Sequence, residues 1–294
     1  MKINWMRYRK LYFAISAVAI TIGVYSLLTW GLNLGVDFKG GTVIDYNFEK
    51  TFSTEEASVE IENMGFDVTA VQQAGDNIYS FKLTTVEEDK RSQIANKLKE
   101  LTGGSVEELR SETVGPSFGP ELVKKTLVAL VLSATVLLFW IAYQFKSIKF
   151  GLSAVLAMLH DSLVVVGLYA LLGHLYGAEA DFLFVTAVLT ILSFSVHDTI
   201  VVYDRIRELK KKHGTDLKII ANKALSETMR RSINNSLTII FMLVALIVLG
   251  GTSIRWFAVA LLIGTISGTY SSPFVAVPIL VTWDELAKKK WLKR

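Results

Sequence analysis

The segment from Phe182 to Tyr203 reads FLFVTAVLTILSFSVHDTIVVY. A helix needs about 20 apolar residues to cross a hydrocarbon core about 30 Å thick, and this segment is long enough. It nevertheless holds His197 and Asp198 side by side in its C-terminal half. An ionisable group in a membrane helix costs about 2.5–3.5 kcal/mol on insertion scales, and such groups usually face a bundle interior where they have a function. The segment therefore predicts a membrane protein with a polar site inside it.

Five further segments have a similar length and apolar character. They are roughly Leu11–Trp30, Leu122–Tyr143, Phe150–Leu172, Ser236–Leu249 with its flanks, and Trp256–Trp283. Hydrophobic residues make up 51% of the 294 and the mean hydropathy is +0.41. The first segment follows four basic residues, as a signal peptide does, but its apolar run is too long and no clear A-x-A site follows it. We expect six transmembrane helices, the first an anchor, and the absence of cysteine excludes disulfides.

Basic residues collect at one end of these helices, which predicts the orientation. They lie in the N-terminus, in the loop with Lys146 and Lys149, between Arg205 and Arg231, and in the tail from Lys288 to Arg294. Both termini are therefore expected in the cytoplasm and residues 31–121 outside it. Residues 35–120 carry a net charge of −8 and the remainder carries +12, within an overall +4. Because the basic residues adjoin membrane helices, they indicate retention and anionic-lipid contact, and no nucleic-acid binding is expected.

The outside segment has the pattern of a small α+β domain. Strands are expected at Gly41–Phe48, Phe66–Gln73, Ile78–Leu83 and Ser105–Val114, with a turn at Gly75-Asp76-Asn77. Capping boxes at Ser53/Glu56 and Thr85/Glu88 begin two helices, the first ending near Met64 and the second burying Ile94, Leu98 and Leu101. The order β-α-β-β-α-β is that of a ferredoxin-like unit. It contains no His and only scattered carboxylates, so we expect it to serve packing or protein contact, or to be a spacer.

Charged residues inside the membrane helices are the candidate site. His160 and Asp161 lie near the middle of the third helix, with Asp161 about 16 Å along the helix from Phe150 at 1.5 Å per residue. A carboxylate that alternates between an apolar setting and contact with an Arg takes up and releases a proton. Asp198 is the first candidate for such a relay, with His197 as co-relay, Arg231 as charge partner and Asp161 as a second carboxylate. The alternative is that these groups form inert ion pairs that tie helices together.

Other chemistries find no support in the residues. No H-E-x-x-H and no P-loop is present, so we expect no metal, no cofactor, no catalytic residue and no enzyme activity. The cytoplasmic segment 208–233 has an apolar stripe typical of an amphipathic helix lying on the membrane face, formed by Leu217, Ile220, Ala221, Ala224, Leu225 and Met229. The last helix has small residues, including Gly264 and Gly268, at a spacing that lets helices approach closely. Four parts are therefore expected. Residues 1–30 form the cytoplasmic N-terminus and the first transmembrane helix, and residues 31–121 form the α+β domain. Residues 122–283 form a five-helix bundle that includes the segment 208–233, and residues 284–294 form a basic cytoplasmic tail.

Several motifs, in order along nearly the whole chain, resemble the SecF family (SecD/SecF family, RND superfamily). They are Gly35-Val36-Asp37-Phe38-Lys39-Gly40-Gly41-Thr42, Val114-Gly115-Pro116 with Glu121-Leu122, His160-Asp161, Asp198-Thr199 with Val201-Val202-Tyr203-Asp204-Arg205-Ile206-Arg207-Glu208, Arg231-Ser232-Ile233-Asn234 with Ser236-Leu237-Thr238, and Gly268-Thr269-Tyr270-Ser271-Ser272. Any one of these motifs is weak, whereas their order and the six-helix topology together are specific.

The resemblance implies an RND-type half-bundle that pairs with the six helices of SecD. It also implies that the complex uses the proton-motive force to draw unfolded preprotein through the Sec channel (SecY/SecE/SecG) of the inner (plasma) membrane. Asp198 would then be the proton-transporting carboxylate and Arg231 its basic partner. His197 stands where the family usually has Asn, Arg230 offers a second arginine, and the chain has no SecD half. A scaffold for SecD and the channel, and an RND-type small-molecule exporter, are the alternative functions.

Overall fold

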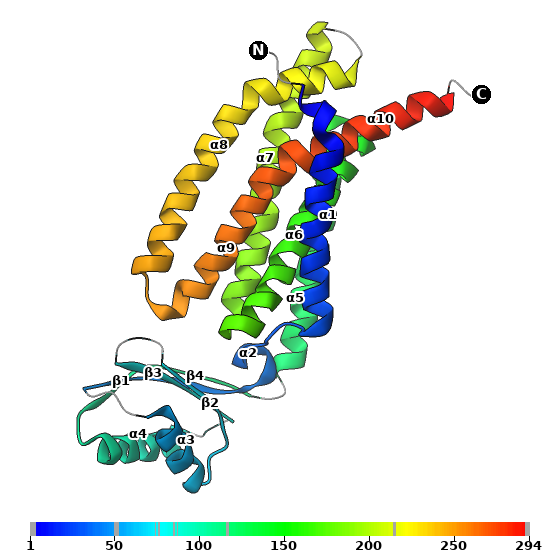
Figure 1. The fold of residues 1–294 in the computed structure, drawn as a ribbon. Coiled ribbons are helices and arrows are strands. Elements are labelled where there is room, and N and C mark those ends of the chain that lie inside the picture. Colours follow the sequence, from blue (N-terminus) through cyan, green and yellow to red (C-terminus); the bar gives the residue numbers. More distant parts are fainter. Residues whose placement is uncertain are drawn as a thin grey trace. The chain divides into compact units, whose positions relative to one another are not determined.

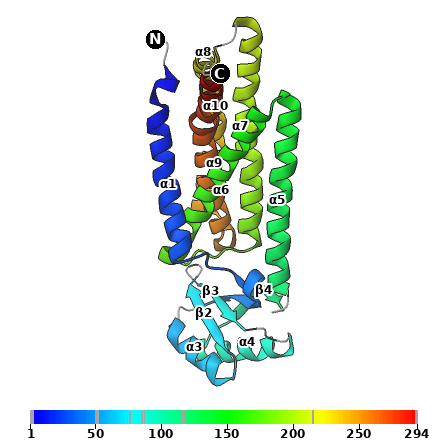
Figure 2. The ribbon, with the colours of Figure 1, turned by 90° about the vertical axis from the view of Figure 1, so that its right-hand side faces the viewer.

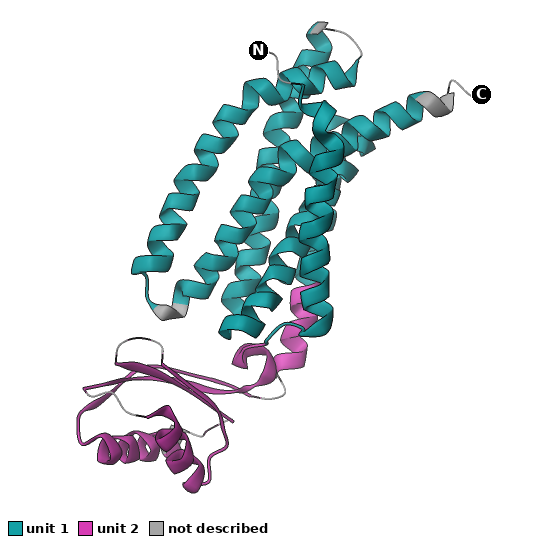
Figure 3. Cartoon of the chain, in the orientation of Figure 1, with its two compact units in different colours: residues 1–33, 128–294 teal, residues 34–127 magenta. Residues whose placement is uncertain are grey.

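The computed structural model describes residues 4–291 apart from 50–52, 74, 76, 85, 87, 116–117 and 214–215. The chain divides into two compact units, coloured separately in Figure 3. One unit combines Met1–Asn33 with Val128–Arg294, and the other is Leu34–Leu127. The first is a helix bundle and the second contains the sheet.

The bundle confirms the six predicted membrane helices (Figures 1 and 2). A short 3-10 turn, η1 (Trp5–Tyr8), leads into α1 (Arg9–Thr29), and the later helices are α5 (Phe118–Phe145), α6 (Ile148–Tyr176), α7 (Phe182–His213), α8 (Leu217–Leu249) and α9 (Thr252–Ser271). Each holds a run long and apolar enough to cross a membrane. Helices α6, α7 and α9 contact one another, while α1 packs on α6 and α8 packs on α7 and α9.

The sixth spanning segment is not one regular α-helix. Helix α9 continues into a π-helical turn, η2 (Ser272–Ala276), and then into α10 (Val277–Trp291), which runs away from the axis of α9 in Figure 1. Pro273 and Pro278 have no N–H to donate, and the Val277 N–H bonds to the Ser272 carbonyl five residues earlier. Proline and π-turns are the usual causes of sharp helix bends.

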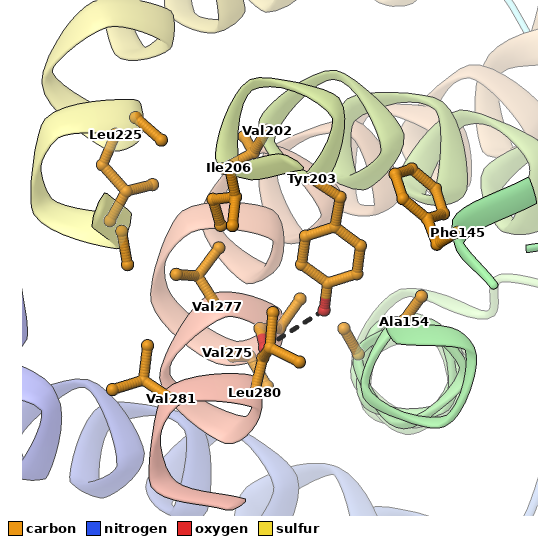
Figure 4. Close-up of a cluster of buried hydrophobic side chains, with 14 of the residues drawn as sticks. Phe145, Ala154, Val202, Tyr203, Ile206, Leu225, Val275, Val277, Leu280 and Val281 are labelled. Atoms are coloured by element: carbon orange, nitrogen blue, oxygen red, sulfur yellow. Dashed lines mark hydrogen bonds between the residues drawn. The ribbon is translucent and has the colours of Figure 1, made fainter. Parts of the chain in front are cut away.

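An apolar cluster closes the bundle at the end where both chain termini lie (Figure 4). It joins Tyr203 and Ile206 of α7 to Leu225 of α8 and Val277 and Val281 of α10. The Tyr203 hydroxyl donates to the Ala276 carbonyl at 3.2 Å, drawn as a dashed line in Figure 4. This end of the bundle is therefore a packed protein core.

The same cluster corrects the predicted setting of the amphipathic segment. The apolar stripe exists, but Leu217, Ile220 and Leu225 are buried against protein, in one cluster with residues of α7 and α10. From Leu217 onward the segment is also the first half of α8, without a break before the spanning part, while residues 208–213 belong to the end of α7. A stripe of this kind looks the same in sequence whether lipid or protein covers it. The stripe packs on the bundle and does not lie on the membrane face.

The second unit is a four-stranded antiparallel sheet with the order β2-β3-β1-β4. Its strands are β1 (Gly41–Phe48), β2 (Val68–Gln73), β3 (Ile78–Leu83) and β4 (Val106–Val114), and its longer helices are α3 (Thr54–Asn63) and α4 (Glu88–Thr102). This is the predicted ferredoxin-like order. Ser53 caps α3 as expected by accepting the Glu56 N–H at 3.5 Å, whereas Thr85 and Asp76 lie outside the described residues.

Alternation along β1 builds the core of this unit. Ile44, Tyr46 and Phe48 are at most 1% exposed and pack with Tyr79 and Phe81 of β3. The helices cover this face with residues at helical spacing, namely Ala57, Ile61, Ile94 and Leu98, whereas Leu101, which was predicted to be buried with them, is exposed.

A double glycine joins β1 to the short helix α2 (Val36–Lys39). Gly40 has φ 80° and Gly41 has φ 133°, conformations that L side chains rarely adopt. A Cβ on Gly41 would lie 2.7 Å from the Leu83 carbonyl oxygen of β3. The motif Gly35, Asp37, Gly40, Gly41 is therefore the turn that starts the sheet.

Candidate functional site

Asp161 is the centre of a polar cluster inside the bundle. It lies on α6 and is fully buried. Its Oδ2 accepts hydrogen bonds from Ser195 of α7 and Ser271 of α9, and its Oδ1 accepts one from Ser267 of α9, all at 2.6 Å. The Nδ1 of His160 lies 3.1 Å from Oδ1. Three hydroxyl donors that converge on one carboxyl connect α6 to α7 and α9.

Asp198 lies on the same helix as Ser195 and has a different environment. It is 4% exposed, and its Oδ2 accepts a hydrogen bond from Ser232 of α8 at 2.7 Å. In the described part of the chain no second donor reaches it, so Oδ1 is left without a hydrogen bond. Asp198 therefore has an oxygen that is available for a proton, whereas both oxygens of Asp161 are occupied.

Arg231 precedes Ser232 in the sequence, but the two side chains project from different faces of α8. Successive residues of a helix project about 100° apart, and Ser232 is buried while Arg231 and Arg230 are exposed. Arg231 lies near enough for its charge to act on Asp198, yet no ion pair within 4.0 Å joins them among the described residues. The sequence predicted Arg231 as the partner of Asp198, and in this conformation Ser232 holds that place.

The two histidines have opposite settings. His160 is buried, stacks against Tyr270 with ring centroids 6.4 Å apart, and has no partner for its Nε2 among the described residues. His197 is exposed on α7. No hydrogen bond between the side chains of His197 and Asp198 is found in the residues that the structure describes. The predicted co-relay role of His197 thus lacks a direct contact here and stays a prediction.

Further hydroxyls extend the polar cluster along α7. Thr199 pairs with Ser272 of η2 at 2.9 Å, and Tyr203 pairs with Ser153 of α6 at 2.6 Å. On the other side of α9, Thr269 donates to Ser236 of α8 at 2.6 Å. The small-residue pattern of the last helix predicted close helix packing, and it gave no signal that Ser267, Ser271 and Ser272 donate hydrogen bonds.

Asp204 and Arg205 of α7 make ion pairs at the end of the bundle. Arg205 pairs through Nε with Glu227 of α8 at 2.6 Å and also with Glu208, and Asp204 pairs with Arg207 at 3.2 Å. Arg207 in turn donates to the Gln144 carbonyl of α5 at 3.0 Å. These pairs connect α7 to α8 and α5 close to the helix ends, as interfacial pairs do.

Two family models match the chain. The model described as Protein export membrane protein SecD/SecF, C-terminal, covers residues 93–286, and the SecD/SecF GG Motif covers residues 25–51. The chain belongs to the SecD/SecF family. The GG motif of this family includes Gly40 and Gly41, and the family's C-terminal region contains both buried carboxylates.

Known members of the SecD/SecF family resemble the chain over most of its length. Protein translocase subunit SecF of Thermobaculum terrenum is 40% identical over 96% of this chain and 94% of that protein, and the SecF of Anaerolinea thermophila is 35% identical over 99% and 97%. The crystal structure of SecDF from Thermus thermophilus, a translocon-associated membrane protein, superposes with a TM-score of 0.84 at 30% identity. The match covers 97% of this chain but only 39% of that SecDF chain.

Proposed function

We propose that the chain is a SecF-type subunit of the Sec protein translocase that couples proton movement to preprotein translocation. Relatives named as SecF match it over nearly their full length, which supports the translocase role. The SecDF of Bacillus subtilis matches 96% of this chain with 38% of its own length. A separate SecD subunit is therefore the proposed partner. Further proposed partners are the SecY/SecE/SecG channel, the unfolded preprotein and membrane lipid.

The observation that supports proton coupling is the unequal hydrogen bonding of the two carboxylates. Asp198 has one hydroxyl donor, on Oδ2, and Asp161 has three hydroxyl donors and a nearby imidazole. A carboxyl that exchanges a proton needs an oxygen that is not already saturated by donors. Asp198 is accordingly the proposed proton carrier, and Asp161 the charge that holds the three central helices in register.

Energy for the step would come from the membrane gradient. Each charge that crosses gains about 2.3 kcal/mol per 100 mV of membrane potential. Arg231 would act on Asp198 once α7 and α8 shift relative to each other, because its charge lies near the site already. The sheet unit and that of SecD would pass the resulting movement to the emerging chain. We place the protein in the inner (plasma) membrane with both termini in the cytoplasm.

The experiment is gradient-dependent completion of preprotein translocation in membrane vesicles that contain a matching SecD. Asp198→Asn keeps the shape of the side chain and removes its titration, so it should abolish the gradient-dependent part while assembly with SecD is retained. Asp284→Asn is the matched control, since Asp284 pairs with Lys149 and Lys288 far from the buried carboxylates, and it should behave as the native protein.

Full activity of Asp198→Asn would contradict proton coupling at this site. It would instead favour the scaffold function, which the tight cluster around Asp161 also supports. An RND-type exporter is the weaker alternative, because the sheet unit spans only residues 34–127 and offers little room for a substrate pocket.

A further inference from the structure

Helix α8 offers Asp198 two neighbouring partners of different chemistry. Its buried hydroxyls Thr228, Ser232 and Ser236 are spaced one turn apart and are 8%, 7% and 1% exposed. Ser232 contacts the carboxylate of Asp198 at 2.7 Å, whereas Arg231 projects to the exposed side. Thr228 donates to the Ala224 carbonyl of its own helix. Among these three hydroxyls, the one of Ser232 is directed at the carboxylate.

We propose that Ser232 is a positioning residue for Asp198, which holds the carboxylate away from Arg231 and sets the pH at which it takes up a proton. This inference rests on the proposed function, in which Asp198 is the proton carrier. A hydroxyl, rather than the arginine, is then the partner of Asp198 during protonation.

The chemistry of a hydroxyl suits this role. A serine hydroxyl is neutral, so it can donate to Oδ2 of the ionised carboxylate and still donate to Oδ2 after the free Oδ1 has taken up the proton. A guanidinium only donates, and it would hold the carboxylate in the charged form. Contact with Ser232 therefore allows both protonation states, and separation from Arg231 keeps the neutral state within reach.

The charges around Asp198 are few, so the effect of one hydroxyl should be measurable. The titratable groups whose charge reaches Asp198 are Arg231 on α8 and His197 on its own helix, although both side chains are exposed, and Asp161 of α6 is linked to α7 through Ser195. The facing stretch of α9 and η2, residues 265–276, contains no Asp, Glu, Lys, Arg or His. Removing the Ser232 hydroxyl thus changes the hydrogen bonding of Asp198 without removing a charge.

The test compares Ser232→Ala with Ser232→Thr in the full chain, reconstituted with SecD in proteoliposomes. The readouts are the pH profile of gradient-dependent translocation and the infrared carbonyl band of the protonated Asp198, identified by its absence in Asp198→Asn. A carboxylate that loses a hydroxyl donor is protonated at higher pH. Ser232→Ala should therefore move both midpoints upward by about one pH unit, a tenfold change in proton affinity. Ser232→Thr keeps the hydroxyl and should retain the native midpoints.

Thr228→Val is the matched control, because it removes a buried hydroxyl one turn away on the same helix, and its midpoints should be native. Ser232→Cys keeps the volume with a weaker donor, so it should give an intermediate shift even if Ser232→Ala fails to assemble. Native midpoints in both Ser232→Ala and Ser232→Cys would overturn the inference. If those native midpoints are found while Asp198→Asn still loses the gradient-dependent translocation, only the role of Ser232 is refuted and the proposed function stands. Unchanged activity of Asp198→Asn would refute the proposed function, while the infrared midpoint would still decide the role of Ser232.

Discussion

The two buried carboxylates show how hydrogen-bond donors, rather than burial alone, set the role of a charge. Asp161 and Asp198 are both almost completely buried, at 0% and 4% exposure. Asp161 is nevertheless surrounded by donors from α7 and α9, and Asp198 receives one from α8. A buried charge is tolerated when hydrogen bonds replace its lost hydration. We therefore expect the cluster around Asp161 to stabilise the bundle.

Asp161→Asn should destabilise the protein more than Asp198→Asn does. The amide of Asn would present N–H groups to hydroxyls that now donate, and each buried polar group left unsatisfied costs about 1–3 kcal/mol. Thermal unfolding in detergent, followed by intrinsic tryptophan fluorescence, should show a clearly lower midpoint for Asp161→Asn and a small change for Asp198→Asn. Equal destabilisation by the two substitutions would mean that the number of donors does not determine the effect.

The carboxylates stand out in the sequence, whereas Ser232, Ser267 and Ser271, which donate hydrogen bonds to them, do not. Asp161 and Asp198 stand out because a charge in an apolar run is rare and costly. Their donors are serines, which are common in membrane helices and carry no such signal. Ser271 also lies 110 positions from Asp161, so the contact depends on how α6 and α9 pack. Knowledge of that packing requires the three-dimensional structure.

At the level of elements, the local sequence was sufficient to predict a helix or strand wherever its hydrophobic pattern was strong. The alternation of β1 gave that strand at its observed bounds, and the apolar runs gave all six helices, although α7 continues past the predicted Tyr203 to His213 and α8 begins at Leu217, well before the predicted Ser236. The π-turn η2 was not predicted, because its residues continue an apolar run and composition does not report a shifted hydrogen bond. The packing of the first half of α8 against the bundle was not predicted for a related reason, because an apolar stripe does not distinguish a protein neighbour from lipid.

Close contact between α1 and α6 depends on two glycines. A Cβ on Gly167 would lie 2.3 Å from the Gly23 Cα, closer than any real contact. Gly167→Ala should therefore separate the helices and lower stability by about 1–3 kcal/mol, the usual cost of overpacking. Ala17→Leu, which enlarges an exposed side chain of α1, should have no comparable effect in the same thermal assay. If Gly167→Ala unfolds like the native protein, the helices do not approach as closely as described.

On the scale of the whole molecule, charge separates along the two units. Residues 35–120, which carry −8, fall within the unit Leu34–Leu127, and the net charge of +12 belongs to the rest of the chain, chiefly the bundle and its loops. Basic loops are retained on the cytoplasmic side during insertion. Composition alone gives this separation of charge, and in the fold the acidic segment forms a compact unit with its own core.

The absence of cysteine allows a direct test of this topology. Asn96→Cys places a thiol on an exposed position of α4, and Lys211→Cys places one on an exposed position at the end of α7. A membrane-impermeant maleimide should label Asn96→Cys in spheroplasts and Lys211→Cys only in inverted vesicles, while the native chain stays unlabelled in both. The reverse pattern would place the sheet unit in the cytoplasm. The basic loops would then have crossed the membrane, and a role of the sheet unit in drawing preprotein outward would be ruled out.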